Sequence, residues 1–472
     1  MSAGFDKDGV VPERTAAVVL AAGDGKRLKS KLPKVLHQAA GRSLLSHVLA
    51  ALKPLALDES VVVASGRVDE IRDGVAGDGL EDGIIYAVQD PPRGTGEATK
   101  IGLAHLSTTE ATILVVPGDA PLIETDTLFR LLSVHRSTQA AATLLTAIVH
   151  DPTGYGRILR SDGQEVERIV EERDATPDQK RLHEINAGVF AFDGSQVAGL
   201  LDKIDTDNSQ GEFYLTDVIE LLRRDDRKVV AVQTGRDEVS GVNNRSQLAY
   251  VSGLLRHRVC ERWMSEGVSI VDPRTTYIDT TVAIEGDATI HPFTFLEGST
   301  TIAEGAEIGP QARIVDSTIG SEATVSYAVV RGSEVGPRAS VGPFASLRPG
   351  NVLKSGAKIG TFVEAKESTF GEDSRANHLS YLGDAEIGER ANIGAGTVTC
   401  NWDGEAKHKT EIGDEAYISS DTMLVAPVRV GRRAATGAGS VVRQDVPDEA
   451  LAVGVPARII EGKGNRIKKQ DD

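Results

Sequence analysis

The sequence is poor in aromatic residues and in cysteine. Phe, Trp and Tyr make up 4% of the 472 residues, whereas Gly occurs 49 times. Few aromatics and many glycines favour small repeated turns packed by aliphatic side chains over an aromatic-rich core. The two cysteines, Cys260 and Cys400, lie far apart in the sequence, which excludes a disulfide framework and a zinc-binding spacing. We therefore expect two free thiols in a reducing cytoplasm.

Long apolar runs are also missing. The longest, around Ala16 to Ala22, is far shorter than the ~20 residues that cross a bilayer. The polar N-terminal segment before it lacks the apolar stretch of a secretory signal. We therefore expect no membrane segment and no leader, and a solvated basic tail from Lys463 to Lys469.

The charge balance limits the kinds of partner. The formal net charge is −17, and an acidic protein has no general affinity for nucleic acid, which needs a basic surface. Small phosphorylated ligands need only a local basic site, so they remain possible.

Up to about residue 267, short apolar runs alternate with helical patterns. Strands are predicted at Ala16–Ala22, Ser60–Ala64, Ala111–Pro117 and Ala141–Val149, and helices at Leu44–Leu52 and Thr125–Val134. This alternation predicts a mostly parallel α/β sheet, a Rossmann-like nucleotide-binding domain over residues 1–245, with ligands beyond the carboxyl ends of its strands. An apolar stripe from Leu248 to Val259 predicts a linking helix over 246–266, although Gly253 interrupts it.

A six-residue rhythm takes over in residues 267–472. The clearest run is Ile412, Ile418, Leu424 and Val430, and Gly follows many of the aliphatic residues. A period of six suits one short strand and one turn, with the aliphatic side chain inward and a small residue at the corner. The rhythm predicts a left-handed parallel β-helix of hexapeptide repeats, with about eleven coils at the ~4.8 Å strand spacing. A polar, cationic stretch between Ile393 and Ile412 predicts an inserted loop.

A glycine-rich loop follows the first predicted strand. Leu20 is followed by Ala-Ala-Gly23-Asp-Gly25-Lys-Arg27, and Pro33-Lys34 comes shortly after. Neither the dinucleotide fingerprint nor the Walker spacing fits. A glycine loop with two cations suits a triphosphate, and a surface turn with scattered charges is the alternative on spacing alone.

The motif L-x-x-G-x-G-x-R with a following P-K resembles the sugar-1-phosphate nucleotidyltransferases. Further matching segments contain Gln89, Gly94-Thr95-Gly96, Pro117-Gly118-Asp119, Thr153–Arg157, Val170-Glu171, Glu184–Gly188, Gly211–Asp217 and Gly241–Arg245. With the β-helix, residues 14 to 460 resemble the bifunctional N-acetylglucosamine-1-phosphate uridyltransferase/glucosamine-1-phosphate N-acetyltransferase family.

The resemblance implies a uridylyl-transfer site in the first domain. Its UTP and UDP-N-acetylglucosamine contacts would be Leu20, Ala21, Ala22, Gly23, Lys34, Gln89, Gly94, Thr95, Pro117, Gly118, Asp119, Gly156, Glu171, Asn186 and Asn243. Arg27 and Lys34 would stabilise charge on the triphosphate, and Asp119 and Asn243 would hold Mg²⁺. Gln89 and Thr95 would bind the base, and Gly156, Glu171 and Asn186 the amino sugar.

The resemblance implies an acetyltransfer site in the β-helix. Arg348 and Lys366 stand one coil apart, a natural phosphate clamp for glucosamine 1-phosphate. His378 would be the general base for the attacking amine, oriented by either Glu364 or Asp384. Tyr381 and Asn392 would also contact glucosamine 1-phosphate, and acetyl-CoA would contact Ala395, Asn401, Trp402, Ser420 and Ala438. The cationic loop with Lys407 and Lys409 would close this site.

Two positions depart from the family pattern. Trp402 stands where members often have Tyr, and Val455 occupies the place of a basic CoA contact, for which Arg458 is a substitute. The expected enzyme acetylates glucosamine 1-phosphate, then uridylylates the product with UTP to UDP-N-acetylglucosamine, a precursor for cell-wall synthesis. A homotrimer with sites at subunit borders is expected. The alternatives are a nucleotidyltransferase with a non-catalytic assembly or regulatory β-helix, and an inactive sugar-nucleotide sensor.

Overall fold

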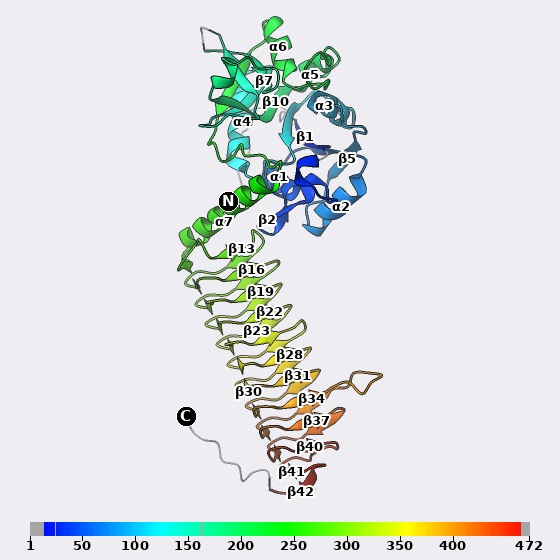
Figure 1. The fold of residues 1–472 in the computed structure, drawn as a ribbon, viewed down its shortest axis with the longest axis vertical. Helices are drawn as coiled ribbons and strands as arrows, with labels where there is room; N and C mark the ends of the chain where they lie inside the picture. Colours follow the sequence, from blue (N-terminus) through cyan, green and yellow to red (C-terminus); the bar gives the residue numbers. More distant parts are fainter. Residues whose placement is uncertain (1–13, 24, 162–163, 464–472) are drawn as a thin grey trace, which may run out of the picture. The chain divides into compact units, whose positions relative to one another are not determined.

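The computed structural model describes residues 14–23, 25–161 and 164–463. The expectations about a leader before Arg14 and a basic tail after Lys463 lie outside these ranges. The chain divides into two compact units, Met1–Leu255 and Arg256–Asp472, and the division falls inside helix α7 (Arg245–Ser265), which covers the segment predicted as a linking helix (Figure 1). Within the described ranges, the structure contains no helix with the length and apolar character needed to cross a membrane.

The first unit is built on a mixed sheet whose strands run in the order β11-β7-β10-β6-β1-β4-β5. These strands are β1 (Thr15–Ala21), β4 (Glu59–Ala64), β5 (Ile84–Val88), β6 (Thr112–Pro117), β7 (Ala142–Ile148), β10 (Glu184–Asp193) and β11 (Val229–Gln233). Strands β8 (Arg157–Arg160) and β9 (Val166–Val170) form a hairpin beside β10, and β2 (Gln38–Ala39) pairs with β3 (Arg42–Ser43). The four strands and two helices predicted in this half are therefore confirmed, with ends shifted by a few residues.

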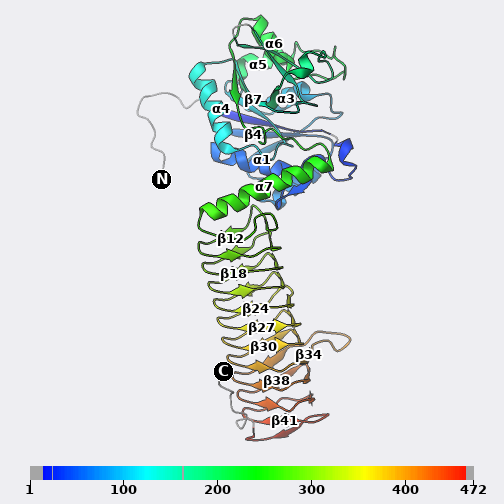
Figure 2. The same ribbon diagram turned by 60° about the vertical axis from the view of Figure 1, so that its left-hand side comes forward.

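Helices cover both faces of this sheet (Figure 2). They are α1 (Leu44–Leu52), α2 (Val68–Gly77), α3 (Thr95–Ala104), α4 (Thr125–Thr138), α5 (Gly194–Leu201) and α6 (Asp217–Arg224), with 3-10 turns η1 (Lys26–Leu28), η2 (Lys34–Leu36), η3 (Lys53–Leu55) and η4 (Gln179–Arg181). Along β1, Ala16 and Val18 join the core under α3, α5 and α6, whereas Ala17 and Val19 join the core under α1, α2 and α4. Alternate side chains of one strand thus serve two cores, which explains why the strand is apolar throughout.

One strand departs from the predicted parallel order. Strand β10 runs antiparallel to both β6 and β7, and its pairing with β7 shifts register between Asn186 and Phe190. An apolar run indicates a buried strand but carries no information about its direction. The register shift matters for function because Asn186 lies at the edge of the cavity described below.

The second unit is a left-handed parallel β-helix with three sheets. One sheet contains β12 (Ser269–Ile270), β15 (Thr289–Ile290), β18 (Glu307–Ile308), β21 (Thr324–Val325), β24 (Ser340–Val341), β27 (Lys358–Thr361), β30 (Arg375–His378), β33 (Asn392–Ile393), β36 (Tyr417–Ile418), β39 (Ala435–Thr436), β41 (Leu451–Val453) and β42 (Arg458–Ile460). The second contains β13 (Tyr277–Ile278), β16 (Phe295–Glu297), β19 (Arg313–Val315), β22 (Val329–Arg331), β25 (Ser346–Leu347), β28 (Glu364–Lys366), β31 (Tyr381–Gly383), β34 (Val398–Cys400), β37 (Met423–Val425) and β40 (Val441–Val442). The third contains β14 (Ala283–Ile284), β17 (Thr301–Ile302), β20 (Thr318–Ile319), β23 (Glu334–Val335), β26 (Val352–Leu353), β29 (Thr369–Phe370), β32 (Ala385–Ile387), β35 (Thr410–Ile412) and β38 (Val428–Val430).

The hexapeptide period places one aliphatic residue of each repeat inside the coil. Ile290, Ile308 and Val325 are fully buried and stack in register on successive coils. Most glycines that follow aliphatic residues, such as Gly320, do not take a left-handed corner as expected, although Gly309 and Gly342 have φ angles of 96° and 114°. At Gly320 an added Cβ would lie 2.7 Å from the backbone nitrogen of Pro337 on the next coil, so the glycine is needed mainly for room.

Many left-handed corners are occupied by larger residues. Phe293, Gln311, Tyr327, Phe344 and Phe362 have φ angles between 48° and 59°, a conformation that non-glycine residues adopt at some cost. The expectation that small residues take the corners is therefore wrong at these positions. Repetition over many coils stabilises a turn that local preference disfavours.

Two features interrupt the regular stack. The segment after β34 leaves it as a hairpin, in which Trp402 and Lys407 form an antiparallel bridge, and this confirms the predicted insertion (Figures 1 and 2). The final strand, β42, runs antiparallel to β41, unlike the parallel coils before it.

Candidate active sites

The first unit contains a cavity of about 600 Å³ at the carboxyl ends of β1 and β6. Sheets of this kind bind ligands at that edge. Most residues predicted for the nucleotide site line it, namely Leu20, Ala21, Ala22, Gly23, Arg27, Lys34, Gln89, Gly94, Thr95, Pro117, Asp119, Glu171, Asn186 and Asn243. Gly118 and Gly156 lie behind this lining. The Gly118 N–H donates to the Leu20 carbonyl at 2.9 Å, which links the two strand ends.

Two cations and two oxygen ligands meet on one side of the cavity. The Lys34 Nζ contacts Asp119 Oδ2 and lies 2.8 Å from Asn243 Oδ1, and Arg27 Nη2 lies 2.9 Å from the same oxygen. Gly25 makes this approach possible, because its φ is 61° and an added Cβ would lie 2.7 Å from the Lys34 Cβ. The glycine loop therefore brings Arg27 and Lys34, the two cations predicted to bind the triphosphate, together at Asn243.

The same cluster fits a magnesium ion chemically. A carboxylate oxygen and an amide oxygen converge on a single ammonium group, so the position between Asp119 and Asn243 already accommodates a cation. Mg²⁺ prefers such oxygen ligands and takes its remaining ones from phosphates and water. In the described part of the chain, no group of three or more His, Cys, Asp or Glu side chains has a metal-binding arrangement.

The opposite wall is a tightly packed backbone that presents Gln89 and Thr95. The buried Gln89 donates from Nε2 to the Gly94 carbonyl at 3.1 Å and to Glu97 Oε2 at 2.9 Å. The Thr95 hydroxyl accepts the Leu215 N–H at 3.1 Å. At Gly94 the φ is 114° and a Cβ would lie 2.5 Å from the Phe213 carbonyl. An amide and a hydroxyl held in this way can read the edge of a base.

Glu171 and Asn186 form a third wall of the cavity, with Gly156 directly behind them. The Asn186 N–H donates to the Gly156 carbonyl at 2.9 Å, and an added Cβ at Gly156 would lie 3.4 Å from the Glu171 carboxylate. Burial raises the pKa of Glu171, whose Oε1 accepts from the Thr216 hydroxyl at 3.2 Å. A desolvated carboxylate beside an amide suits the hydroxyl and amide groups of a sugar.

Several lining residues were not predicted as site residues. They are Gly25, Lys26, Val35, Pro92, Ala98, Gly188, Phe190, Glu212, Leu215 and Thr216. The segment Gly211–Asp217 was matched as a motif, but no role was derived for it. At the end of this segment, burial and then the negative charges of Asp205 and Glu171 raise the pKa of Asp217 to about 6. Only the fold shows that this segment reaches the cavity.

In the second unit, His378 belongs to a column of residues on successive coils. Strand pairing places His378 opposite Thr361, and the pairing of Ala376 with Ile393 and of Ile393 with Ile418 extends the register. His378, Ala395 and Ser420 each lie two residues after one of the paired residues Ala376, Ile393 and Ile418, so they stack on successive coils. The Gly439 N–H bonds the Ser420 carbonyl at 2.9 Å, which places Ala438 next. Residues predicted separately for catalysis and for acetyl-CoA therefore share one corner of the β-helix.

The adjacent sheet presents the predicted phosphate clamp. Arg348 follows β25, Lys366 ends β28 and Tyr381 begins β31, on consecutive coils. Lys407 of the hairpin comes within hydrogen-bond reach of Lys366, and together with the Arg348 charge it lowers the pKa of the Lys366 ammonium. Three cations thus converge on a small area, as expected for a site that binds a phosphate group.

The two carboxylates considered as partners of His378 have other contacts. Glu364 accepts from Arg348 Nη1 at 3.1 Å, and Asp384 accepts from Asn401 Nδ2 at 2.5 Å. Among the described residues, neither carboxylate is hydrogen-bonded to the exposed His378 ring. The choice between Glu364 and Asp384 stays open.

The remaining residues predicted to contact the acetyl-transfer substrates lie mostly on the hairpin and near the last strand. Trp402 is exposed at the base of the hairpin, and Asn392 begins β33 on the coil after His378. Lys409 lies 2.9 Å from Glu386 of its own chain, whereas Lys407 reaches Lys366, so the two lysines point to different places. Val455 is exposed before β42, which Arg458 begins.

Comparison with known proteins identifies the family. A family model described as a MobA-like NTP transferase domain matches residues 17–182. Proteins described as bifunctional protein GlmU match almost the whole chain. The one from Streptomyces avermitilis is 48% identical over 93% of this chain and 91% of its own length. The one from Mycobacterium leprae is 48% identical over 95% of this chain and 92% of its own length. The one from Brevibacillus brevis is 44% identical over 93% of this chain and 94% of its own length.

The chain belongs to the GlmU family. It is a bifunctional enzyme of UDP-N-acetylglucosamine biosynthesis, with uridyltransferase and acetyltransferase activities. Mg²⁺ serves the uridylyl transfer, and acetyl-CoA is the acetyl donor. The match covers both units, which favours this function over the two alternatives derived from the sequence.

Proposed function

We propose that the two activities are divided between the two halves of the chain. Residues 1–245 would carry uridylyl transfer, residues 267–472 acetyl transfer, and residues 246–266 would link them. The single observation that supports this most is the convergence of Arg27, Lys34, Asp119 and Asn243 in the cavity of the first unit. The corner column that contains His378 supports the second assignment.

In the uridylyl site, catalysis is positioning and charge neutralisation. A phosphate oxygen of N-acetylglucosamine 1-phosphate attacks the α-phosphorus of UTP, and the bond to pyrophosphate breaks. Bound between Asp119 and Asn243, Mg²⁺ would supply charge neutralisation on the phosphates. Lys34 and Arg27 stabilise the negative charge that builds on the leaving group. Gln89 and Thr95 orient the base, and Gly156, Glu171 and Asn186 orient the sugar.

In the acetyl site, the amine of glucosamine 1-phosphate attacks the thioester carbonyl of acetyl-CoA. His378 accepts the proton from the amine, and the bond to the CoA sulfur breaks. Arg348 and Lys366 hold the phosphate, while Tyr381 and Asn392 contact the sugar. Ala395, Ser420 and Ala438 hold acetyl-CoA along the corner, where their small side chains leave space for it, and Asn401 and Trp402 contact it from the hairpin.

Hydrogen–deuterium exchange tests this division without any mutation. We expect UTP with Mg²⁺ to slow exchange in peptides containing residues 20–34 and 89–96, and acetyl-CoA to slow exchange in peptides containing residues 395–402, 420 and 438. Each ligand serves as the control for the other. Protection of the first set by acetyl-CoA, or of the β-helix by UTP, would contradict the division.

An exposed apolar ridge supports the proposal of a homotrimer. Phe293, Tyr327, Phe344, Phe362 and Leu379 occupy left-handed corners of the β-helix, and all five are exposed, Phe362 by 60%. The Tyr327, Phe344 and Phe362 rings follow one another with centroids 5.6 Å apart. Apolar rows of this kind mark interaction surfaces. Because Leu379 follows His378 directly, a second copy seated on the ridge would lie beside the acetyl site.

The double variant Phe344→Glu, Phe362→Glu tests the ridge. Two carboxylates would have to be desolvated in the subunit contact, so light scattering should report monomers. Acetyl transfer should fall at least ~10-fold, and uridylyl transfer should change less than ~2-fold. Phe129→Glu is the matched control, because Phe129 is a solitary phenylalanine of α4 with 66% exposure. A double variant that remains a trimer would remove the ridge from the contact.

The free thiols support a cytoplasmic location. Cys260 is buried and Cys400 half-buried, and neither forms a disulfide. Burial raises the pKa of Cys260 to about 11, so this thiol stays protonated and unreactive.

A further inference from the structure

Arg157 is a fully buried arginine beside the sugar side of the cavity, and the mechanism above gives it no role. It begins β8, and 1% of its side chain is exposed. A guanidinium keeps its charge at any physiological pH, so its burial is costly unless hydrogen bonds and an opposite charge compensate it. The contacts of Arg157 therefore indicate what the protein gains from it.

The Arg157 guanidinium joins two segments that are separate in the sequence. Its Nη2 donates to Glu172 Oε2 at 2.7 Å and to the Lys180 carbonyl at 3.4 Å, and its Nη1 donates to the Tyr155 carbonyl. Glu172 Oε2 also accepts the Gly154 N–H at 3.3 Å. One ion pair therefore ties the loop before β8 to the segment after β9.

Each tied segment carries a residue of the sugar wall. Gly156 directly precedes Arg157, and Glu171 directly precedes Glu172. An added Cβ at Gly156 would lie 3.4 Å from the Glu171 carboxylate, so the two segments are neighbours where the sugar would lie. A small shift of either segment would change the width of the pocket at this point.

The neighbouring carboxylates Glu171 and Glu172 have opposite electrostatic environments. For Glu172, burial alone would raise the pKa, but hydrogen bonds from Arg157 and from the Gly154 N–H outweigh it and lower the pKa. For Glu171, burial dominates and raises the pKa. The Arg157 charge is thus directed to Glu172, and Glu171 remains available to a ligand.

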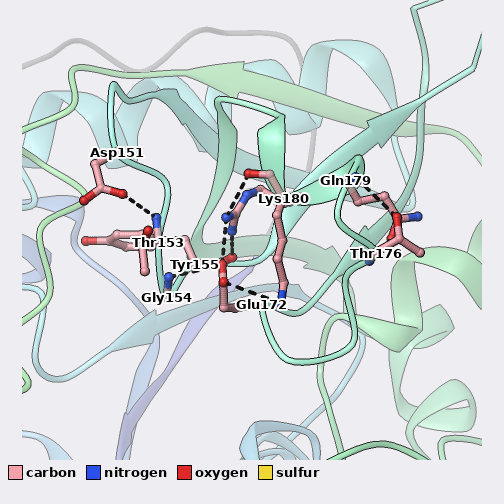
Figure 3. Close-up of polar contacts among 9 residues, drawn as sticks. Asp151, Thr153, Gly154, Tyr155, Glu172, Thr176, Gln179 and Lys180 are labelled. Carbon is pink, nitrogen blue, oxygen red and sulfur yellow. Dashed lines mark hydrogen bonds and ion pairs between the residues drawn. The ribbon is translucent and has the colours of Figure 1, made fainter.

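Further hydrogen bonds fix both ends of this connection. The Thr176 N–H donates to Gln179 Oε1 at 2.9 Å, and the Gln179 N–H donates to the Thr176 hydroxyl at 3.3 Å. These two hydrogen bonds fix the turn that contains Lys180. On the other side, Asp151 Oδ1 accepts the Thr153 N–H at 3.1 Å (Figure 3). The guanidinium therefore bridges two segments that are each held by local hydrogen bonds.

We propose that Arg157 is a positioning residue that sets the width of the amino-sugar side of the uridylyl-transfer pocket. It holds residues 153–156 against residues 172–180, so that Gly156, Glu171 and Asn186 meet the sugar at a fixed spacing. This inference rests on the proposed assignment of those three residues to the sugar. A lysine cannot replace Arg157, because a single ammonium group cannot reach Glu172 and two carbonyls with the geometry of a planar fork.

The test compares Arg157→Lys with Arg160→Lys in the full-length enzyme. Arg160 is the matched control: it lies on the same strand and makes a two-bond pair with Glu184, at 2.8 Å and 2.6 Å. For Arg157→Lys we expect the KM for N-acetylglucosamine 1-phosphate to rise at least ~10-fold, with the KM for UTP and kcat within ~3-fold. Acetyl transfer should be unchanged. Glu172→Gln, which keeps the shape of the side chain, should shift the same KM in the same direction.

Two outcomes would overturn the inference. Arg160→Lys could raise the same KM equally, or the KM for UTP could rise in parallel, and either result would mean general loosening of the unit. If Arg157→Lys does not fold, Glu172→Gln decides by the same criterion. Glu171→Gln and Asn186→Ala separate this inference from the proposed function. If they leave the sugar-phosphate KM unchanged, the sugar assignment itself fails. If they raise it while Arg157→Lys does not, only the role of Arg157 fails.

Discussion

Replacing His378 by alanine is expected to stop acetyl transfer while uridylyl transfer continues. Removal of a general base typically lowers a rate by ~10²–10⁴-fold, and the attacking amine would lose the proton acceptor proposed for it. The His378 ring is exposed and makes no hydrogen bond to Glu364 or Asp384, so its loss should leave the fold intact.

The assay supplies glucosamine 1-phosphate, acetyl-CoA, UTP and Mg²⁺ and measures UDP-N-acetylglucosamine. The His378→Ala enzyme should form product only after N-acetylglucosamine 1-phosphate is added, and then at a rate within ~2-fold of wild type. His291→Ala is the control, because this histidine lies on an earlier coil and bonds Glu307 at 2.9 Å. If His378→Ala acetylates at the normal rate, another group is the base.

Replacing Lys34 by alanine should have the converse effect. Its Nζ lies between Asp119 and Asn243 and next to the Arg27–Asn243 contact, where charge would build on the triphosphate. Loss of such a preorganised charge commonly costs ~10²–10³-fold in kcat. Pyrophosphate release should therefore fall by that factor, and acetyl transfer should remain within ~2-fold.

Lys29→Ala is the matched control for Lys34→Ala. Lys29 follows the same glycine loop, but it is exposed and does not line the cavity. Raising the Mg²⁺ concentration should not rescue Lys34→Ala, because the missing charge belongs to the protein. A Lys34→Ala enzyme with wild-type kcat would exclude Lys34 from the reaction, and an equal loss in Lys29→Ala would indicate a general effect of loop charge.

The sequence predicted features that depend on local pattern. Apolar strands such as β1 and β6 and the six-residue rhythm were visible, because burial sets their spacing directly. The cavity residues Arg27 and Lys34 were singled out because the glycine loop follows a strand end, where a parallel sheet collects its ligands, whereas Asp119 was assigned through the family resemblance.

Features that depend on distant backbone contacts were not predictable. Nothing in the β10 segment indicates that it runs antiparallel to its neighbours. The need for glycine at Gly320 comes from Pro337 on the next coil, and no local preference reports it. The sequence does not distinguish Arg157 from the other arginines, and only the fold shows that it is buried against Glu172 and Lys180.

The reversed last strand, β42, has a consequence for association. The last coil of a β-helix has an edge strand whose unpaired N–H and C=O groups can hydrogen-bond a strand of another chain. By folding back across β41, β42 occupies that terminus. In this sheet the parallel coils therefore stop at β41, and β42 covers the edge on which the backbone of a further coil would otherwise pair.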